Sequence, residues 1–139
     1  MLYNILKNVH NWIGYIVLII LLIATINAIM GWLYKKNFSS KDLRLSLFAL
    51  IFCHIQMLLG LTLYFISPKG LSAFGEMKNS ELRLTWLEHP LVNIIAIALI
   101  TIGWSKHKKI TDDHNKFKKI AIYYGIAFLL ILSRFPLSS

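Results

Sequence analysis

Three histidines stand inside or beside long apolar runs of this chain, and their imidazoles are the side chains best suited to chemistry. His54 lies within "IFCHIQMLLG", whereas His10 and His89 lie near the ends of two other apolar stretches. Ionisable side chains are costly within a lipid bilayer, and they usually face a bundle interior, a cavity or a cofactor. Neutral imidazole binds haem iron, zinc or copper and can also relay protons. These three histidines therefore form the candidate site.

Ligation of haem b is the chemistry that fits the surrounding residues best. A b-type haem needs one or two imidazoles that project between helices, apolar neighbours, and cations near its propionates. Arg83 and Arg134 are the candidate propionate partners, together with Lys7. The side chains expected to line the haem slot are Trp12, Met57, Tyr64 and Trp86. The chain has no C-x-x-C-H motif, the signature of covalently attached haem c.

Two pairings of these histidines stay open, and both include His89. Counted from the outer membrane boundary at about 1.5 Å per residue, His10 lies about 3 Å above it, His89 about 4.5 Å below and His54 about 18 Å below. Counted from the opposite helix ends, His54 and His89 come within about 9 Å of a common height. A helix tilt of about 20° and a kink at Pro90 can absorb part of either difference.

Each histidine also has a simpler interpretation. An imidazole in a membrane helix can hydrogen-bond another helix, a contact worth about 0.6 kcal/mol, and the candidate partners here are Asn27, Gln56 and Asn93. His107 and His114 differ from the other three because they lie in a lysine-rich segment, so we expect solvated imidazoles there. Cys53, the only cysteine, is expected to be a buried packing residue.

Four apolar segments must position these residues. The chain has 139 residues, of which 57% are hydrophobic, and the expected spans cover about 8–34, 43–66, 80–105 and 114–134. A helix of about 20 residues crosses a hydrocarbon core, and backbone at that depth must satisfy its own hydrogen bonds. The sequence therefore predicts an all-α protein, an integral membrane antiparallel four-helix bundle, with one domain over 1–139. A signal peptide is the alternative for the first span, but its apolar core would be only about 7 to 15 residues long.

The basic residues predict how the bundle is oriented. The net charge is +9, and "KKNFSSKDLR" and "KHKKITDDHNKFKK" hold ten of the fifteen lysines and arginines. Short loops rich in lysine and arginine stay in the cytoplasm, so both termini are expected outside, an N-out, C-out arrangement. Because the charge flanks apolar spans, its expected partners are anionic lipid headgroups, and no nucleic acid is expected.

Helical periodicity predicts which residues face inward. On the first span, one side carries small residues below His10, namely Gly14, Val17, Leu21, Ala24, Ala28 and Gly31. On the second, the predicted stripe is Leu47, Leu50, Ile51, His54, Met57, Leu58, Leu61, Tyr64 and Phe65. On the third, it is Leu82, Thr85, His89, Asn93, Ala96, Ile100 and Gly103.

Four segments carry a resemblance to a known family: "HNWIGYIVL", "CHIQMLLGLTLYFISP", "MKNSELRLTWLEHP" and "ITIGWSKHKK". Together they resemble a family of small four-span membrane proteins from the Bacteroidetes, often labelled cytochrome b-like. The resemblance covers nearly the whole chain and implies a multi-pass protein of the bacterial plasma (inner) membrane, whose histidines match His10, His54 and His89. The family pattern H-x-x-x-R places an arginine where this chain has Gly14. A role for that arginine would therefore fall to Arg83 or Arg134.

Two classes of function follow from these observations. The first is a membrane cytochrome that holds haem b between helices and transfers electrons between quinol and a redox partner. The second is a non-enzymatic accessory subunit of a larger respiratory or secretion complex in the membrane. A transition-metal site or a proton path is a third possibility, although the spans lack acidic residues at mid-membrane depth. The chain has no nucleophile elbow or phosphate-binding glycine loop that would indicate ordinary catalysis.

Overall fold

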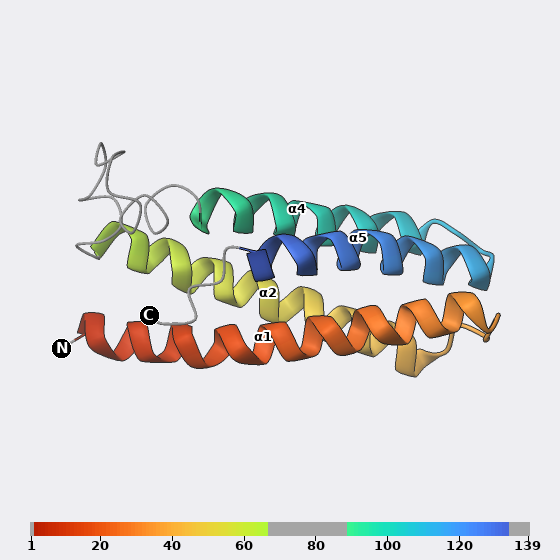
Figure 1. The fold of residues 1–139 in the computed structure, drawn as a ribbon, viewed down its shortest axis with the longest axis horizontal. Coiled ribbons are helices and arrows are strands. Elements are labelled where there is room, and N and C mark those ends of the chain that lie inside the picture. Colours follow the sequence, from red (N-terminus) through yellow and green to blue (C-terminus); the bar gives the residue numbers. More distant parts are fainter. Residues whose placement is uncertain (1, 67–88, 134–139) are drawn as a thin grey trace.

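The computed structural model describes residues 2–66 and 89–133, which form four α-helices and contain no strand. These helices are α1 (Leu2–Leu33), α2 (Ser40–Ile66), α4 (His89–Lys108) and α5 (Asp113–Ser133). They make a helical bundle in which α1 packs against α2 and α5, and α4 packs against α5 and α2 (Figure 1). The predicted all-α class is confirmed for this part of the chain.

Three helices in the described part of the chain are long and apolar enough to cross a membrane. They are Leu2–Leu33, Ser40–Ile66 and Pro90–Lys108. The fourth predicted span, 114–134, is matched by the helix α5, which is not among those three. The expected start of the third span at Ser80 lies outside the described residues.

Polar side chains define the ends of the helices at the two basic loops. The Asp42 carboxylate accepts hydrogen bonds from the Ser39 backbone N–H and hydroxyl, both at 2.9 Å, and so satisfies the N–H of the residue that precedes α2. The same carboxylate accepts a bond from the Asn27 amide at 2.8 Å, which ties α1 to α2. At α5, the Asn115 N–H donates to Asp112 at 3.1 Å. The N-cap of α5 is therefore Asp112.

The predicted inward faces of the first and third spans are confirmed where the structure describes them. The buried residues of α1 are Gly14, Val17, Leu21, Ala24, Thr25, Ala28 and Gly31. On α4, Ala96, Ile100 and Gly103 are buried as expected. The small residues let neighbours approach closely, because a Cβ on Gly31 would overlap the Phe117 ring of α5.

The predicted inward face of α2 was wrong for four of its nine residues, whereas Leu50 and Met57 do pack against the core. Its buried residues are Ser46, Ala49, Cys53 and Leu63, whereas Ile51, Leu58, Leu61 and Phe65 from the predicted stripe are exposed. Three of these four buried residues are small, and small residues let neighbouring helices approach closely. Cys53 is buried in this packing, as expected.

Candidate functional site

His10 lies partly buried in the seam between α1 and α2. A Cβ placed on Gly60 would lie 3.2 Å from His10 Nε2, so the absence of a side chain at Gly60 makes room for the imidazole. One turn earlier on α2, Gln56 donates its amide to the His10 backbone carbonyl at 2.7 Å. Gln56 Oε1 is buried and has no hydrogen-bond partner. The seam around His10 is therefore close-packed and partly polar. Its Gln56 Oε1 acceptor receives no hydrogen bond.

Gln56 was expected to be a hydrogen-bond partner for a histidine. It does bond His10, but through the backbone rather than the imidazole. Asn27, the second expected partner, instead bonds Asp42 at the opposite end of α1. The amide of Gln56 therefore fixes the α1 backbone at the histidine and leaves the ring itself to other contacts.

His54 lies in a different seam, between α2 and α4. Its Nδ1 lies 2.8 Å from the Leu50 carbonyl one turn back, so Nδ1 carries the proton and Nε2 is the basic nitrogen. That Nε2 lies 3.4 Å from the Thr101 hydroxyl of α4, which itself donates to the Ile97 carbonyl at 2.8 Å. At the depth of His54, α2 and α4 are thus close enough for a side-chain contact.

The depths of the three histidines in the bundle can be compared from their positions along the packed helices. His89 begins α4 at the end of the bundle where α2 finishes and where the N-terminus of α1 lies (Figure 1). Thr101, which is level with His54, is twelve residues from His89, or about 18 Å along α4. Gly60, in contact with His10, is about 9 Å nearer that end than His54 is. His10 is therefore closer than His54 to the depth of His89.

Several predicted site residues fall outside the described part of the chain. They are Arg83, Arg134 and Trp86, together with the side chain of His89. Among the expected lining residues, Met57 packs against the core, but Trp12 is 73% exposed and lines no slot. Trp12 lies two residues before Gly14, about 200° around the helix from the buried face of α1, which places its ring on the outer surface.

The expectation of a solvated His107 was wrong. This residue is fully buried, its Nδ1 lies 2.5 Å from the Trp104 carbonyl, and its ring packs against Trp104 and Phe38 at centroid distances of 4.7 and 5.4 Å. Its Nε2 has no hydrogen-bond partner. His107 continues the inward stripe of α4 one turn beyond Gly103, and that spacing was the sequence signal for its burial. His114 is also partly buried, with an unpartnered Nδ1.

Residues 2–66 and 89–133 contain no group of three or more His, Cys, Asp or Glu side chains that could hold a metal ion. A multidentate zinc or copper site is therefore not formed by the described residues. Axial ligation of haem needs only one or two imidazoles, and His10 and His54 each present one between helices. In comparisons with known proteins, no family model, no curated protein and no solved structure matches this chain.

Proposed function

We propose that this protein is a membrane-embedded b-type cytochrome that carries electrons between quinol and a redox partner. The observation that carries the proposal is the contact of His10 with Gly60, where an imidazole stands between two apolar helices at a position kept free of a side chain. An imidazole placed between helices in this way is suited to ligate haem iron. Three helices with the length and composition of membrane spans support the placement in a bilayer.

His10 and His89 are the preferred axial ligands. Two ligands of one haem must lie at similar depth. Along the helix axes, His10 lies about 9 Å nearer than His54 to the depth of His89, which favours His10 as its partner. The contact between His54 and Thr101 also closes the seam between α2 and α4 at the depth of His54. Arg83 and Arg134 remain the proposed partners of the propionates.

The residues around His10 fit such a group. The missing side chain at Gly60 lets the imidazole fit against α2, and the Gln56 amide holds the α1 backbone in place. The apolar helix surfaces would exclude water, which affects the reduction potential of a buried iron centre. When bound, haem b would supply reversible one-electron transfer. The role of the chain's own residues is to bind the group, orient it and keep it dry.

His54 is the proposed contact for quinol, beside the haem site. Its protonated Nδ1 is engaged with Leu50, which leaves Nε2 as a base that can accept a hydrogen bond from a quinol hydroxyl. Thr101, its neighbour across the seam, is exposed on the outer surface of the bundle, where a lipid-soluble molecule can reach it. The imidazole can therefore take up a proton as the quinol is oxidised.

The proposed location is the bacterial plasma membrane, with both termini outside. The lysine-rich segments at 35–44 and 106–119 lie at one end of the bundle, as a cytoplasmic location for both loops requires (Figure 1). The resemblance to the cytochrome b-like family of the Bacteroidetes implies the same membrane location.

The second candidate is a non-enzymatic accessory subunit of a larger respiratory or secretion complex. It is favoured by the contact between His54 and Thr101, which gives this imidazole a protein neighbour on each nitrogen without any ligand. In that case the histidines serve helix packing, and the exposed apolar side chains of α1 meet other subunits instead of lipid.

The visible spectrum of the purified protein, oxidised and then reduced with dithionite, tests the proposal. A b-type cytochrome shows a sharp α band on reduction, and His10→Ala and His89→Ala should each abolish or strongly shift it. His54→Ala should retain the band but slow reduction by a soluble quinol. His114→Gln is the matched control, since it alters a histidine at the opposite end of the bundle. A colourless protein that co-purifies with larger subunits would support the accessory role instead.

A further inference from the structure

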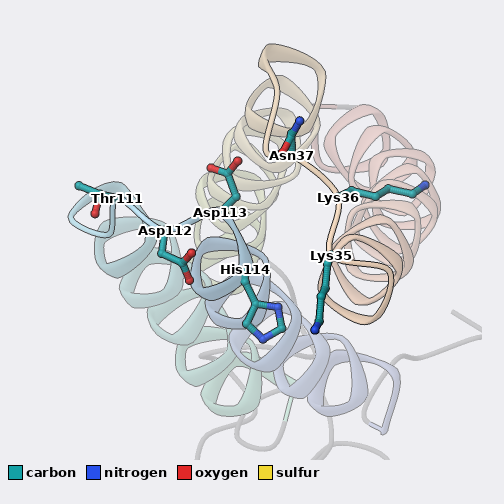
Figure 2. Close-up of a pocket in the computed structure, with 7 residues that line it drawn as sticks. All are labelled: Lys35, Lys36, Asn37, Thr111, Asp112, Asp113 and His114. Carbon is teal, nitrogen blue, oxygen red and sulfur yellow. The ribbon is translucent and has the colours of Figure 1, made fainter.

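A pocket of about 440 Å³ lies between the two basic loops at the end of the bundle opposite His10 (Figure 2). One wall comes from the segment after α1, and the other from the start of α5 and the two residues preceding it. Its lining residues are Lys35, Lys36, Asn37, Thr111, Asp112, Asp113 and His114. All of them carry polar side chains, unlike the helix surfaces that lead to the pocket.

The charges in this pocket are divided between its two walls. Lys35 and Lys36 supply two positive charges from the α1 side, whereas Asp112 and Asp113 supply two carboxylates from the α5 side. An anion alone would be repelled by the carboxylates, and a cation alone by the lysines. A ligand with a phosphate at one end and an ammonium at the other matches both walls.

His114 supplies a polar atom that the protein leaves unsatisfied. Its Nδ1 is buried and has no hydrogen-bond partner, although the residue lines the pocket. Figure 2 shows the Lys35 and His114 side chains extending in the same direction from the two facing walls. A phosphate oxygen placed between them could accept hydrogen bonds from both.

The backbone at Lys35 is held in a conformation that normally favours glycine. Lys35 has a φ of 52°, and the Lys36 N–H donates to the Gly31 carbonyl at 3.0 Å, the pattern of a Schellman motif at a helix C-terminus. Glycine is the usual residue at this position because it has no Cβ. Lysine there gives up local stability and places a charge at the mouth of the pocket.

The position of Trp32 indicates that the pocket lies at the depth of the lipid headgroups. Trp32, in the last turn of α1, lies with its ring centroid 6.4 Å from that of His114, and Lys118 Nζ lies 6.0 Å from the centre of the Trp32 ring. Tryptophan is enriched where a membrane protein meets the polar headgroups. The pocket therefore lies where a lipid headgroup would be.

We infer that this pocket binds the headgroup of an aminophospholipid, with its phosphate between Lys35 and His114 and its ammonium on the side of the pocket that carries Asp112 and Asp113. The inference rests on the membrane placement in the proposed function but not on haem. If alkaline carbonate released the protein from membranes, the placement itself would fail. A colourless protein would leave the lipid inference intact.

Native mass spectrometry of the detergent-purified full chain provides the test. The probes are the short-chain lipids dioctanoyl phosphatidylethanolamine, phosphatidylcholine and phosphatidylglycerol, and soluble phosphoethanolamine without acyl chains. We expect phosphatidylethanolamine to bind about tenfold more tightly than the other lipids, since phosphatidylcholine lacks N–H donors and phosphatidylglycerol lacks a cation. Equal affinity for the three lipids would overturn the inference. Equal affinity for soluble phosphoethanolamine would overturn its assignment to a membrane lipid.

Variants separate the two walls. Lys35→Gln with Lys36→Gln should weaken binding of phosphatidylethanolamine about tenfold. Asp112→Asn with Asp113→Asn should abolish the preference for phosphatidylethanolamine over phosphatidylglycerol, and asparagine at 112 can still cap α5. Lys41→Gln removes a lysine at the same end that does not line the pocket, so it should change affinity less than twofold.

Lys35→Gly distinguishes a ligand site from a structural one. Glycine suits the φ of 52°, so this variant should unfold at a higher temperature than the parent. It also removes a pocket charge and should bind phosphatidylethanolamine several-fold more weakly. A variant that gains stability and keeps full affinity would overturn the role of Lys35.

Discussion

The Thr101 hydroxyl lies 3.4 Å from His54 Nε2 across the seam between α2 and α4, yet it donates its proton to the Ile97 carbonyl at 2.8 Å. Thr101 is thus a close neighbour of the imidazole and at most a weak donor to it. The contact keeps the two helices together at this depth without occupying the basic nitrogen. His54 is therefore held in place mainly by its own helix, through Leu50, with Thr101 as a weak neighbour of Nε2.

Replacement of this hydroxyl should have a small effect. Thr101→Val keeps the shape of the side chain and removes only the bonds of the hydroxyl, so we expect the free energy of unfolding to change by less than about 1 kcal/mol. The haem bands should stay at full intensity because the preferred ligands are His10 and His89. Thermal unfolding in detergent and a reduced spectrum measure both quantities. Loss of the bands would place His54 and Thr101 inside the haem site.

Gly60→Ala should disturb His10 in a measurable way. The new methyl group would lie 3.2 Å from Nε2, so the imidazole must move by a few tenths of an ångström. We expect a shifted or weakened α band with little loss of helix content. Gly125→Ala is the control, because its Cβ would lie at an ordinary 3.5 Å from the Thr25 methyl group. Identical spectra for the two variants would contradict a ligand role for His10.

Gly31→Ala should destabilise the bundle through a clash between α1 and α5. A Cβ at this position would overlap the ring of Phe117, which is 1% exposed and has no free space to move into. Overpacking of this kind costs about 1–3 kcal/mol. The thermal unfolding temperature should fall clearly below that of Gly125→Ala. An equal temperature for both would mean that α1 and α5 are less tightly packed than described.

Tyr124→Phe tests the contact between α5 and α2. The Tyr124 hydroxyl is buried and donates to the Ser46 carbonyl at 2.9 Å, so its removal should cost about 0.5–1.5 kcal/mol. Tyr34→Phe alters an exposed hydroxyl and should leave the unfolding temperature unchanged. The comparison is read from thermal unfolding of both variants. A Tyr124→Phe protein as stable as Tyr34→Phe would show that this bond contributes nothing.

The sequence predicted α1 and α4 well because their small residues recur at helical spacing. Gly14, Ala24 and Gly31 are each one or more turns apart, and in a membrane such a stripe marks a packing face. On α2 the prediction followed the large apolar residues, which in lipid carry no information about the interior. The stripe of Ser46, Ala49 and Cys53 was visible in the sequence by the same rule that succeeded on α1.

The candidate site was less predictable than the fold. That His10 and Gly60 meet depends on how α1 and α2 slide against each other, and no spacing within one helix encodes that offset. His107 was assigned to solvent from its lysine neighbours, although its register with Gly103 indicated burial. Local composition describes the average surroundings of a segment, whereas the helical period decides the direction of each side chain.

The less apolar character of α5 has a consequence for the order in which the chain assembles. Phe117, Ile120 and Tyr124 are buried against neighbours that are synthesised earlier. A segment whose first turns carry Lys116, Lys118 and Lys119 gains its buried contacts only once those neighbours are in place. We therefore expect the pair of helices α1 and α2, linked by the bond between Asn27 and Asp42, to assemble first. The last helix, α5, then inserts against the surface that the earlier helices have formed.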